Sequence, residues 1–74
     1  MKYLVIEIQT NQDGTVGNLV TAHDTLNAAE SKYHLVLSYA AVSELPMHAA
    51  SLIRSDGAVL ASQFYTHGEE VEEA

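Results

Sequence analysis

Two segments near the start of the chain carry the hydrophobic pattern of β-strands. Residues 2–10 (KYLVIEIQT) are rich in β-branched and aromatic side chains, with polar residues alternating with isoleucines towards the end, and this predicts a strand. Residues 16–23 (VGNLVTAH) predict a second strand, with Gly17 as a candidate bulge. Between them, Asn-Gln-Asp-Gly at 11–14 favours a turn, because the glycine reaches positive φ without a Cβ penalty. The two segments therefore predict a β-hairpin.

The next segment changes to residues that favour a helix. Its content shifts to Ala, Leu, Glu and Lys, which predicts a helix that begins after an N-cap at Asp24 or Thr25 and runs to about Ser43. At 100° per residue, one apolar stripe is expected to face the core, and it contains Leu26, Ala29, Tyr33, Val36, Leu37 and Ala40. A smaller apolar group lies nearly opposite and contains Ala28, Leu35, Tyr39 and Val42.

A second hairpin is predicted after the helix. Pro46 ends the helix because it lacks a backbone donor and biases the preceding residue away from helical geometry. Residues 47–55 (MHAASLIRS) and 58–66 (AVLASQFYT) predict two further strands, and Asp-Gly at 56–57 predicts a two-residue hairpin turn between them.

These elements predict an α+β domain with the element order β-β-α-β-β. The simplest assembly is a four-stranded antiparallel sheet with one helix packed across one face. We place the first strand centrally because it is the most apolar, and a right-handed crossover through the helix then suggests the strand order 2-1-3-4.

The two faces of the predicted sheet differ in what covers them. We expect Leu4, Ile6 and Ile8 to face the helix, because they form the more apolar side of the first strand. The open face is then expected to carry two tyrosines and several aliphatic residues, which is more apolar than a solvated sheet needs. These residues are Tyr3, Val5, Val59, Ala61 and Tyr65.

Length and charge limit the classes of protein that remain. The 74 residues suffice for one domain, expected over residues 1–67, and the Glu-rich residues 68–74 predict a disordered acidic tail. The net charge is −7, but residues 1–68 hold six acids and three bases, a net of −3. Three cations are too few for a phosphate-binding footprint, so we expect no nucleic-acid partner.

The apolar runs and the cysteine count add further limits. The longest apolar run in the first twenty residues is three residues, at 4–6, which predicts neither a signal peptide nor a membrane span and makes a cytoplasmic location the expectation. The chain has no cysteine, so disulfides cannot supplement its small core. Either self-association supplements the core, or a well-packed core is sufficient by itself.

Histidines are the main candidates for chemistry. His23, His34, His48 and His67 are separated by eleven, fourteen and nineteen residues, whereas metal ligands usually recur at short spacings. One alternative function is therefore a metal- or small-ligand-binding module that uses His23 and His48 with neighbouring carboxylates. Serines occur without a nucleophile motif, and the glycines form no phosphate-binding loop. We accordingly expect no catalytic residue and no cofactor.

The leading hypothesis is a small non-enzymatic interaction or assembly protein that associates with itself as a homodimer or with another protein. One candidate interface is the expected open sheet face, with Tyr3, Val5 and Tyr65. The other is the outer side of the helix, with Leu35, Tyr39 and Val42. In the competing interpretation of the helix group, Tyr39 and Val42 pack under the segment 45–46, and Leu35 is an ordinary exposed residue.

The run MKYLVIEIQTNQDGTVGNLVTAHDTLNAAESKYH and the segment Pro-Met-His-Ala-Ala at 46–50 resemble a group of short uncharacterised proteins of Firmicutes and their prophages. In that group the same strand-turn-strand opening leads into a similar AESKYH helix, and an acidic or Pro/Glu-rich tail of variable length follows. The genes often lie near late structural or tail genes. The resemblance implies a prophage-associated role, but the group has no assigned activity or site residues to carry over.

Overall fold

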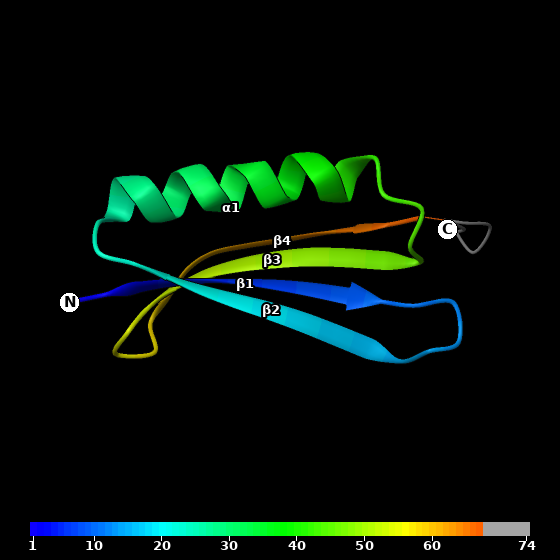
Figure 1. Ribbon diagram of the computed structural model, residues 1–74, viewed down its shortest axis with the longest axis horizontal. Helices are drawn as coiled ribbons and strands as arrows, with labels where there is room; N and C mark the ends of the chain where they lie inside the picture. Colours follow the sequence, from blue (N-terminus) through cyan, green and yellow to red (C-terminus); the bar gives the residue numbers. More distant parts are fainter. Residues whose placement is uncertain (68–74) are drawn as a thin grey trace.

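The computed structural model describes residues 1–67, which form one antiparallel sheet and one helix (Figure 1). The sheet order β2-β1-β3-β4 confirms the predicted order and the α+β class. The helix lies along one face of the sheet, and no other element formed by residues 1–67 covers the opposite face (Figure 1). The predicted tail at 68–74 lies outside the described residues. The elements are β1 (Tyr3–Thr10), β2 (Val16–His23), α1 (Leu26–Ala41), β3 (Met47–Arg54) and β4 (Val59–Thr66).

The β3–β4 hairpin has a three-residue loop, so the predicted two-residue turn at Asp-Gly is wrong. The Gly57 N–H donates to the Arg54 carbonyl at 2.8 Å, and the Arg54 N–H donates to the Ala58 carbonyl at 2.8 Å. Ser55 therefore belongs to the loop as well. This is a type I turn followed by a left-handed residue, and Gly57 takes that position with φ 95°.

The β1–β2 hairpin repeats this construction. The Gly14 N–H donates to the Asn11 carbonyl at 3.0 Å, and the Asn11 N–H donates to the Thr15 carbonyl at 2.8 Å. Asp13 strengthens the loop because its Oδ1 accepts from the Thr15 backbone N–H at 3.0 Å and from the Thr15 hydroxyl at 2.7 Å. Gly14 has φ 89°, a region that L-residues rarely adopt.

Replacing Gly14 by alanine is expected to lower the free energy of unfolding by about 1 kcal/mol, because a Cβ is strained in the left-handed region. Gly17→Ala is the matched control, since Gly17 lies in β2 without a positive φ and a Cβ there meets nothing within 4 Å. Urea denaturation of both variants measures the difference. Equal destabilisation of the two variants would contradict the turn geometry.

The sheet irregularity lies in β4 and not at Gly17, where a bulge was expected. β1 and β2 pair in continuous register from Tyr3 to Thr10. In the other hairpin, Leu52 pairs with Ala61 whereas Ile53 pairs with Val59, so Leu60 is the extra residue of β4.

Capping bonds set the ends of α1. The Thr25 hydroxyl accepts from the Ala28 N–H at 3.1 Å, which confirms Thr25 as one of the two predicted N-caps. The helix ends at Ala41, two residues before the predicted end. At that end the His67 ring Nε2 lies 2.8 Å from the Ala40 carbonyl oxygen, which also accepts from the Ser43 N–H at 3.3 Å.

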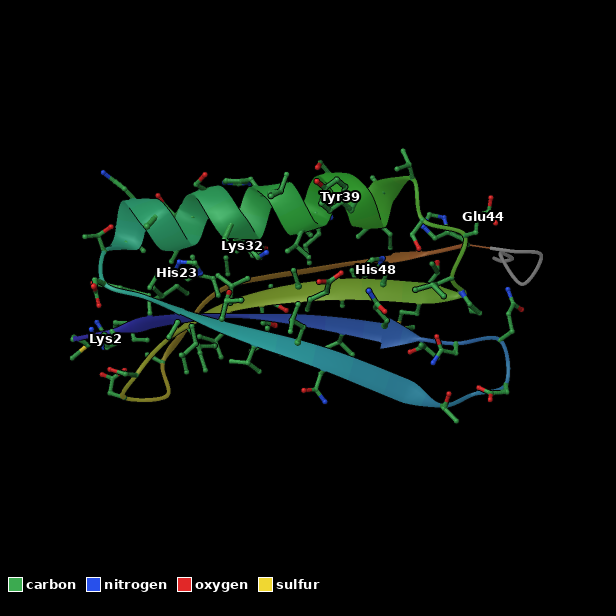
Figure 2. All side chains as sticks on the ribbon, viewed as in Figure 1. Lys2, His23, Lys32, Tyr39, Glu44 and His48 are labelled. Atoms are coloured by element: carbon green, nitrogen blue, oxygen red, sulfur yellow. The ribbon has the colours of Figure 1, made fainter. Side chains whose placement is uncertain are left out.

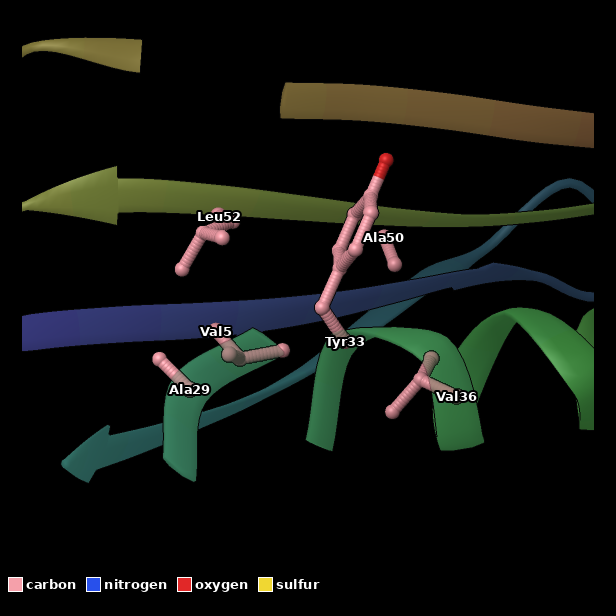
Figure 3. Close-up of a cluster of buried hydrophobic side chains, with 6 residues drawn as sticks. All are labelled: Val5, Ala29, Tyr33, Val36, Ala50 and Leu52. Carbon is pink, nitrogen blue, oxygen red and sulfur yellow. The ribbon is translucent and has the colours of Figure 1, made fainter. Parts of the chain in front are cut away.

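The core lies between α1 and the two central strands (Figure 3). Tyr3, Leu37 and Ala61 pack against this cluster. The predicted orientation of β1 is therefore wrong, because Tyr3 and Val5 face the helix. Leu4, Ile6 and Ile8 lie on the opposite side, since successive strand residues alternate between faces. The buried cluster consists of Val5, Ala29, Tyr33, Val36, Ala50 and Leu52.

Candidate interaction surface

The sheet face opposite α1 is left uncovered by the other elements of residues 1–67, and we call it the open face. Its members follow from strand pairing, because residues paired across antiparallel strands point to the same side. It carries no charged side chain among the described residues. The open face consists of Leu4, Ile6, Ile8, Thr10, Val16, Asn18, Val20, Ala22, Met47, Ala49, Ser51, Ile53, Val59, Ser62, Phe64 and Thr66.

The rim strands of the open face hold its most exposed apolar side chains. Val59 is 65 % exposed, Phe64 61 % and Val20 50 %. Near the centre of the face, the Ser51 and Ser62 hydroxyls lie 3.0 Å apart and hydrogen-bond to each other. This bond partly satisfies two of the few polar groups on the face, so the surface offers mainly apolar contact.

Glu7 and Gln9 of β1 lie on the other side, beneath the helix. His48 of β3 is 4 % exposed, and its Nε2 donates to the Glu7 carboxylate at 2.6 Å. Gln9 Nε2 donates to the same carboxylate oxygen at 3.0 Å. Burial, the largest single influence, raises the pKa of Glu7, but the hydrogen bonds from His48 and Gln9 and the charges of His48 and Lys32 outweigh it. The pKa of Glu7 therefore lies below its usual value of 4.5.

The Glu7–His48 pair lies in a largely buried site. The Nδ1 atom of His48 is buried and has no hydrogen-bond partner within the described part of the chain. The Glu7 side chain is itself only 15 % exposed.

The outer side of α1 carries a second, smaller apolar group. Leu35 is 45 % exposed, Tyr39 59 % and Val42 79 %. The interpretation in which Tyr39 and Val42 pack under the segment 45–46 is therefore wrong. These three residues span seven positions, or about 10 Å at about 1.5 Å per helical residue, so they form a short strip.

The interface residues predicted on the sheet lie on the helix side. Val5 is 1 % exposed in the core, Tyr3 packs against the core cluster, and Tyr65 pairs with the buried His48. The hydrophobic pattern did not point to Phe64 and the apolar residues around it, because the predicted orientation of β1 was reversed. No local pattern signals the correct side, because the contact that buries the Glu7 carboxylate with His48 joins residues 41 positions apart in the chain.

The histidines do not converge on one point. His23 pairs with Tyr3 at one end of β1, and His48 pairs with Gln9 near the other end (Figure 2). Six residues at about 3.3 Å each put them about 20 Å apart along the sheet. Within residues 1–67 no group of three His, Cys, Asp or Glu residues could hold a metal ion. A site that requires both His23 and His48 is incompatible with this register.

Ion pairs lie at the end of the sheet where β1 begins. Lys2 pairs with Asp24 just before α1, and the Arg54 guanidinium lies 2.8 Å from the Asp56 carboxylate in the β3–β4 turn. Hydrogen bonding to Lys2, reinforced by its charge, lowers the pKa of Asp24. Lys2 precedes β1 and Asp24 follows β2, so this pair borders the open face at its Leu4–Ala22 end.

Comparisons with known proteins add no further information. No protein-family model, no curated protein and no solved structure matches this chain. Within the described residues, α1 does not have the combination of length and apolar character that crossing a membrane requires.

Proposed function

We propose that this protein is a small assembly module that associates with a second copy of itself through the open face. The supporting observation is the distribution of polar residues between the two sides of the sheet. Glu7 and His48 are buried together beneath α1, whereas the strand residues described on the uncovered side include no charged one. Burying a carboxylate costs free energy, so charged residues are expected on the sheet face that contacts water.

The size of the open face supports a stable contact. Four strands about 4.8 Å apart and eight residues long at about 3.3 Å each cover about 500 Å². Two copies packed face to face therefore bury about 1,000 Å² or more, which reaches the lower range of specific interfaces. The strip formed by Leu35, Tyr39 and Val42 is much smaller, which favours the sheet as the main interface.

Charge supports a second copy as the partner. The chain has a net charge of −7, so two copies repel each other wherever charged surfaces meet. The open face is the broad surface without charge in the described domain, and packing it against itself brings no like charges together. The resulting two-fold arrangement is a β-sandwich with the sheets about 10 Å apart and both helices outside.

The resemblance to prophage-encoded proteins suggests where such a module acts. A small protein that multiplies contacts by self-association fits the building of a larger particle, and we include prophage-associated assembly in the proposal on that ground. The self-association itself rests on the open face and stands independently of this suggestion.

The test compares two exposed aromatic residues on opposite sides of the molecule. Phe64→Glu is expected to raise the dissociation constant of the open-face contact about 100-fold or more, because each copy would bury an unpaired carboxylate. Tyr39→Glu is the matched control, since Tyr39 is 59 % exposed and Phe64 61 %. Light scattering and sedimentation velocity across micromolar concentrations measure the mass of both variants.

Each outcome of this comparison has a definite meaning. A decrease in mass for Phe64→Glu with no change for Tyr39→Glu supports the open face as the interface between the two copies. The reverse result would move the interface to the outer side of α1. A wild-type protein that remains monomeric at all concentrations would overturn self-association, and the open face would then require a different partner.

A further inference from the structure

β2 is an edge strand that lacks the usual protection against pairing with another chain. Edge strands are commonly blocked by charged side chains, proline, a bulge or short length. β2 spans eight residues (VGNLVTAH), contains no Lys, Arg, Asp, Glu or Pro, and pairs with β1 without a register shift. The other edge strand, β4, is interrupted by the irregularity near Leu60.

Two backbone bonds identify which groups of β2 point outward. The Asn11 N–H donates to the Thr15 carbonyl, which makes these two residues a hydrogen-bonded pair. Every second residue of β2 after Thr15, starting with Gly17, therefore forms its backbone hydrogen bonds with β1. Independently, the Ser55 N–H donates to the Lys2 carbonyl, so the even-numbered residues of β1 form their backbone hydrogen bonds with β3. The odd-numbered residues of β1 therefore form theirs with β2. The outward N–H and C=O groups of β2 therefore belong to Val16, Asn18, Val20 and Ala22.

These four residues lie symmetrically about Leu19. A two-fold axis through Leu19, perpendicular to the sheet, places Val16 opposite the Ala22 position of a second copy and Asn18 opposite its Val20 position. This antiparallel register pairs every outward N–H and C=O of both strands. We propose that β2 pairs with β2 of a second copy in this register, which forms one continuous eight-stranded sheet.

The proposal also gives a role to the exposed Leu19 side chain. Leu19 pairs with Glu7, so it points to the helix side of the sheet. It is nevertheless 55 % exposed, because the helix packs mainly over β1 and β3. Edge pairing brings the two Leu19 side chains together at a position without hydrogen bonds, where Cα atoms are about 4.5 Å apart. Both leucines then lose exposed apolar surface.

The edge contact is separate from the open-face contact of the proposed function. Edge pairing keeps both helices on one side and joins the two open faces into one wider surface. Packing two such surfaces together produces a tetramer with two kinds of two-fold contact. Either contact can form without the other, so each can be disrupted by itself.

A single cysteine at position 19 tests the register. The chain has no cysteine of its own, and a Cα separation of about 4.5 Å suits a disulfide. Under mild oxidation we expect Leu19→Cys to form covalent dimers at least about tenfold faster than Gly17→Cys. Gly17 is the matched control because it is exposed on the same side of β2 and a Cβ there meets nothing within 4 Å. In the proposed register its two copies lie about 13 Å apart.

Proline at position 18 tests the pairing without breaking the domain. The Asn18 N–H points outward, so Asn18→Pro keeps the bonds to β1 and removes a donor from the edge, whereas Asn18→Ala retains that donor. In the Leu19→Cys background we expect proline to slow cross-linking at least about tenfold and alanine to have little effect. Circular dichroism confirms that both variants fold.

The outcomes separate this contact from the open face. In the Leu19→Cys background, Phe64→Glu is expected to leave an edge-paired dimer that still cross-links through position 19. Asn18→Pro is expected to leave a dimer held by the open face, and this dimer does not cross-link through position 19. Cross-linking of Leu19→Cys no faster than that of Gly17→Cys would overturn the register. Cross-linking unaffected by Asn18→Pro would overturn the pairing of β2, while the open-face contact would still be judged from Phe64→Glu.

Discussion

Replacing Leu52 by alanine is expected to lower the free energy of unfolding by about 3 kcal/mol, in the range found for buried leucines. Leu52 is 2 % exposed and belongs to the largest fully buried side chains, packed between the sheet and α1. The neighbouring Ile53 lies in the same strand on the open face and is only partly buried. Ile53→Ala is therefore expected to cost about 1 kcal/mol in a monomer, because less apolar surface returns to water.

Urea denaturation at equilibrium measures both variants, and the Phe64→Glu background removes the contribution of open-face association. The comparison tests the orientation of the sheet directly, because one residue separates the two positions. A larger loss for Ile53→Ala than for Leu52→Ala would show that the other face lies under the helix. That result would restore the orientation expected from the hydrophobic pattern alone.

Replacing His48 by leucine is expected to lower the free energy of unfolding by about 2–3 kcal/mol at neutral pH. The change leaves the Glu7 carboxylate without its closest partner in a site where Glu7 is only 15 % exposed. Gln9 still donates to that carboxylate, so the loss stays at the lower end for a broken buried pair. The double variant Glu7→Leu/His48→Leu is expected to return to within about 1 kcal/mol of the wild type, because two apolar side chains need no charge partner.

The pH dependence provides an independent measurement of the same pair. The pKa of Glu7 is lowered below 4.5 in the folded protein, so its contribution to stability is present above pH 4.5 and is lost as pH falls through the lowered pKa. The difference between wild type and His48→Leu is therefore expected to shrink on acidification below 4.5. Asp13, Asp24 and Asp56 also have lowered pKa values, but they act in both proteins and cancel in the difference. A constant difference down to pH 2 would contradict the role assigned to Glu7.

Local patterns were sufficient to predict the elements and their order. The β-rich runs, the Thr25 cap and the proline at 46 have effects that act within a few residues, so their consequences can be worked out without tertiary contacts. The detailed ends depended on contacts from distant residues. His67, which follows β4, bonds to the last turn of α1, and no local signal in the helix indicates this.

The candidate site was harder to predict because it depends on which side of β1 faces the helix. Both sides of this strand are apolar at its start, with Tyr3 and Val5 on one side and Leu4 and Ile6 on the other. A helix can cover either side, and a shift of one residue exchanges the two sets completely. The more apolar set was assigned to the core, and that assignment was wrong.

The sequence by itself determined an α+β domain with two hairpins, one helix and the strand order β2-β1-β3-β4, since periodicity, turn residues and crossover handedness are local or topological constraints. Only the tertiary structure decided which sheet face is covered. The deciding contact joins Glu7 and His48, which are 41 residues apart in the chain. Once these two polar groups satisfy each other beneath α1, the uncharged side of the sheet remains exposed, and that exposed surface is the basis of the proposed function.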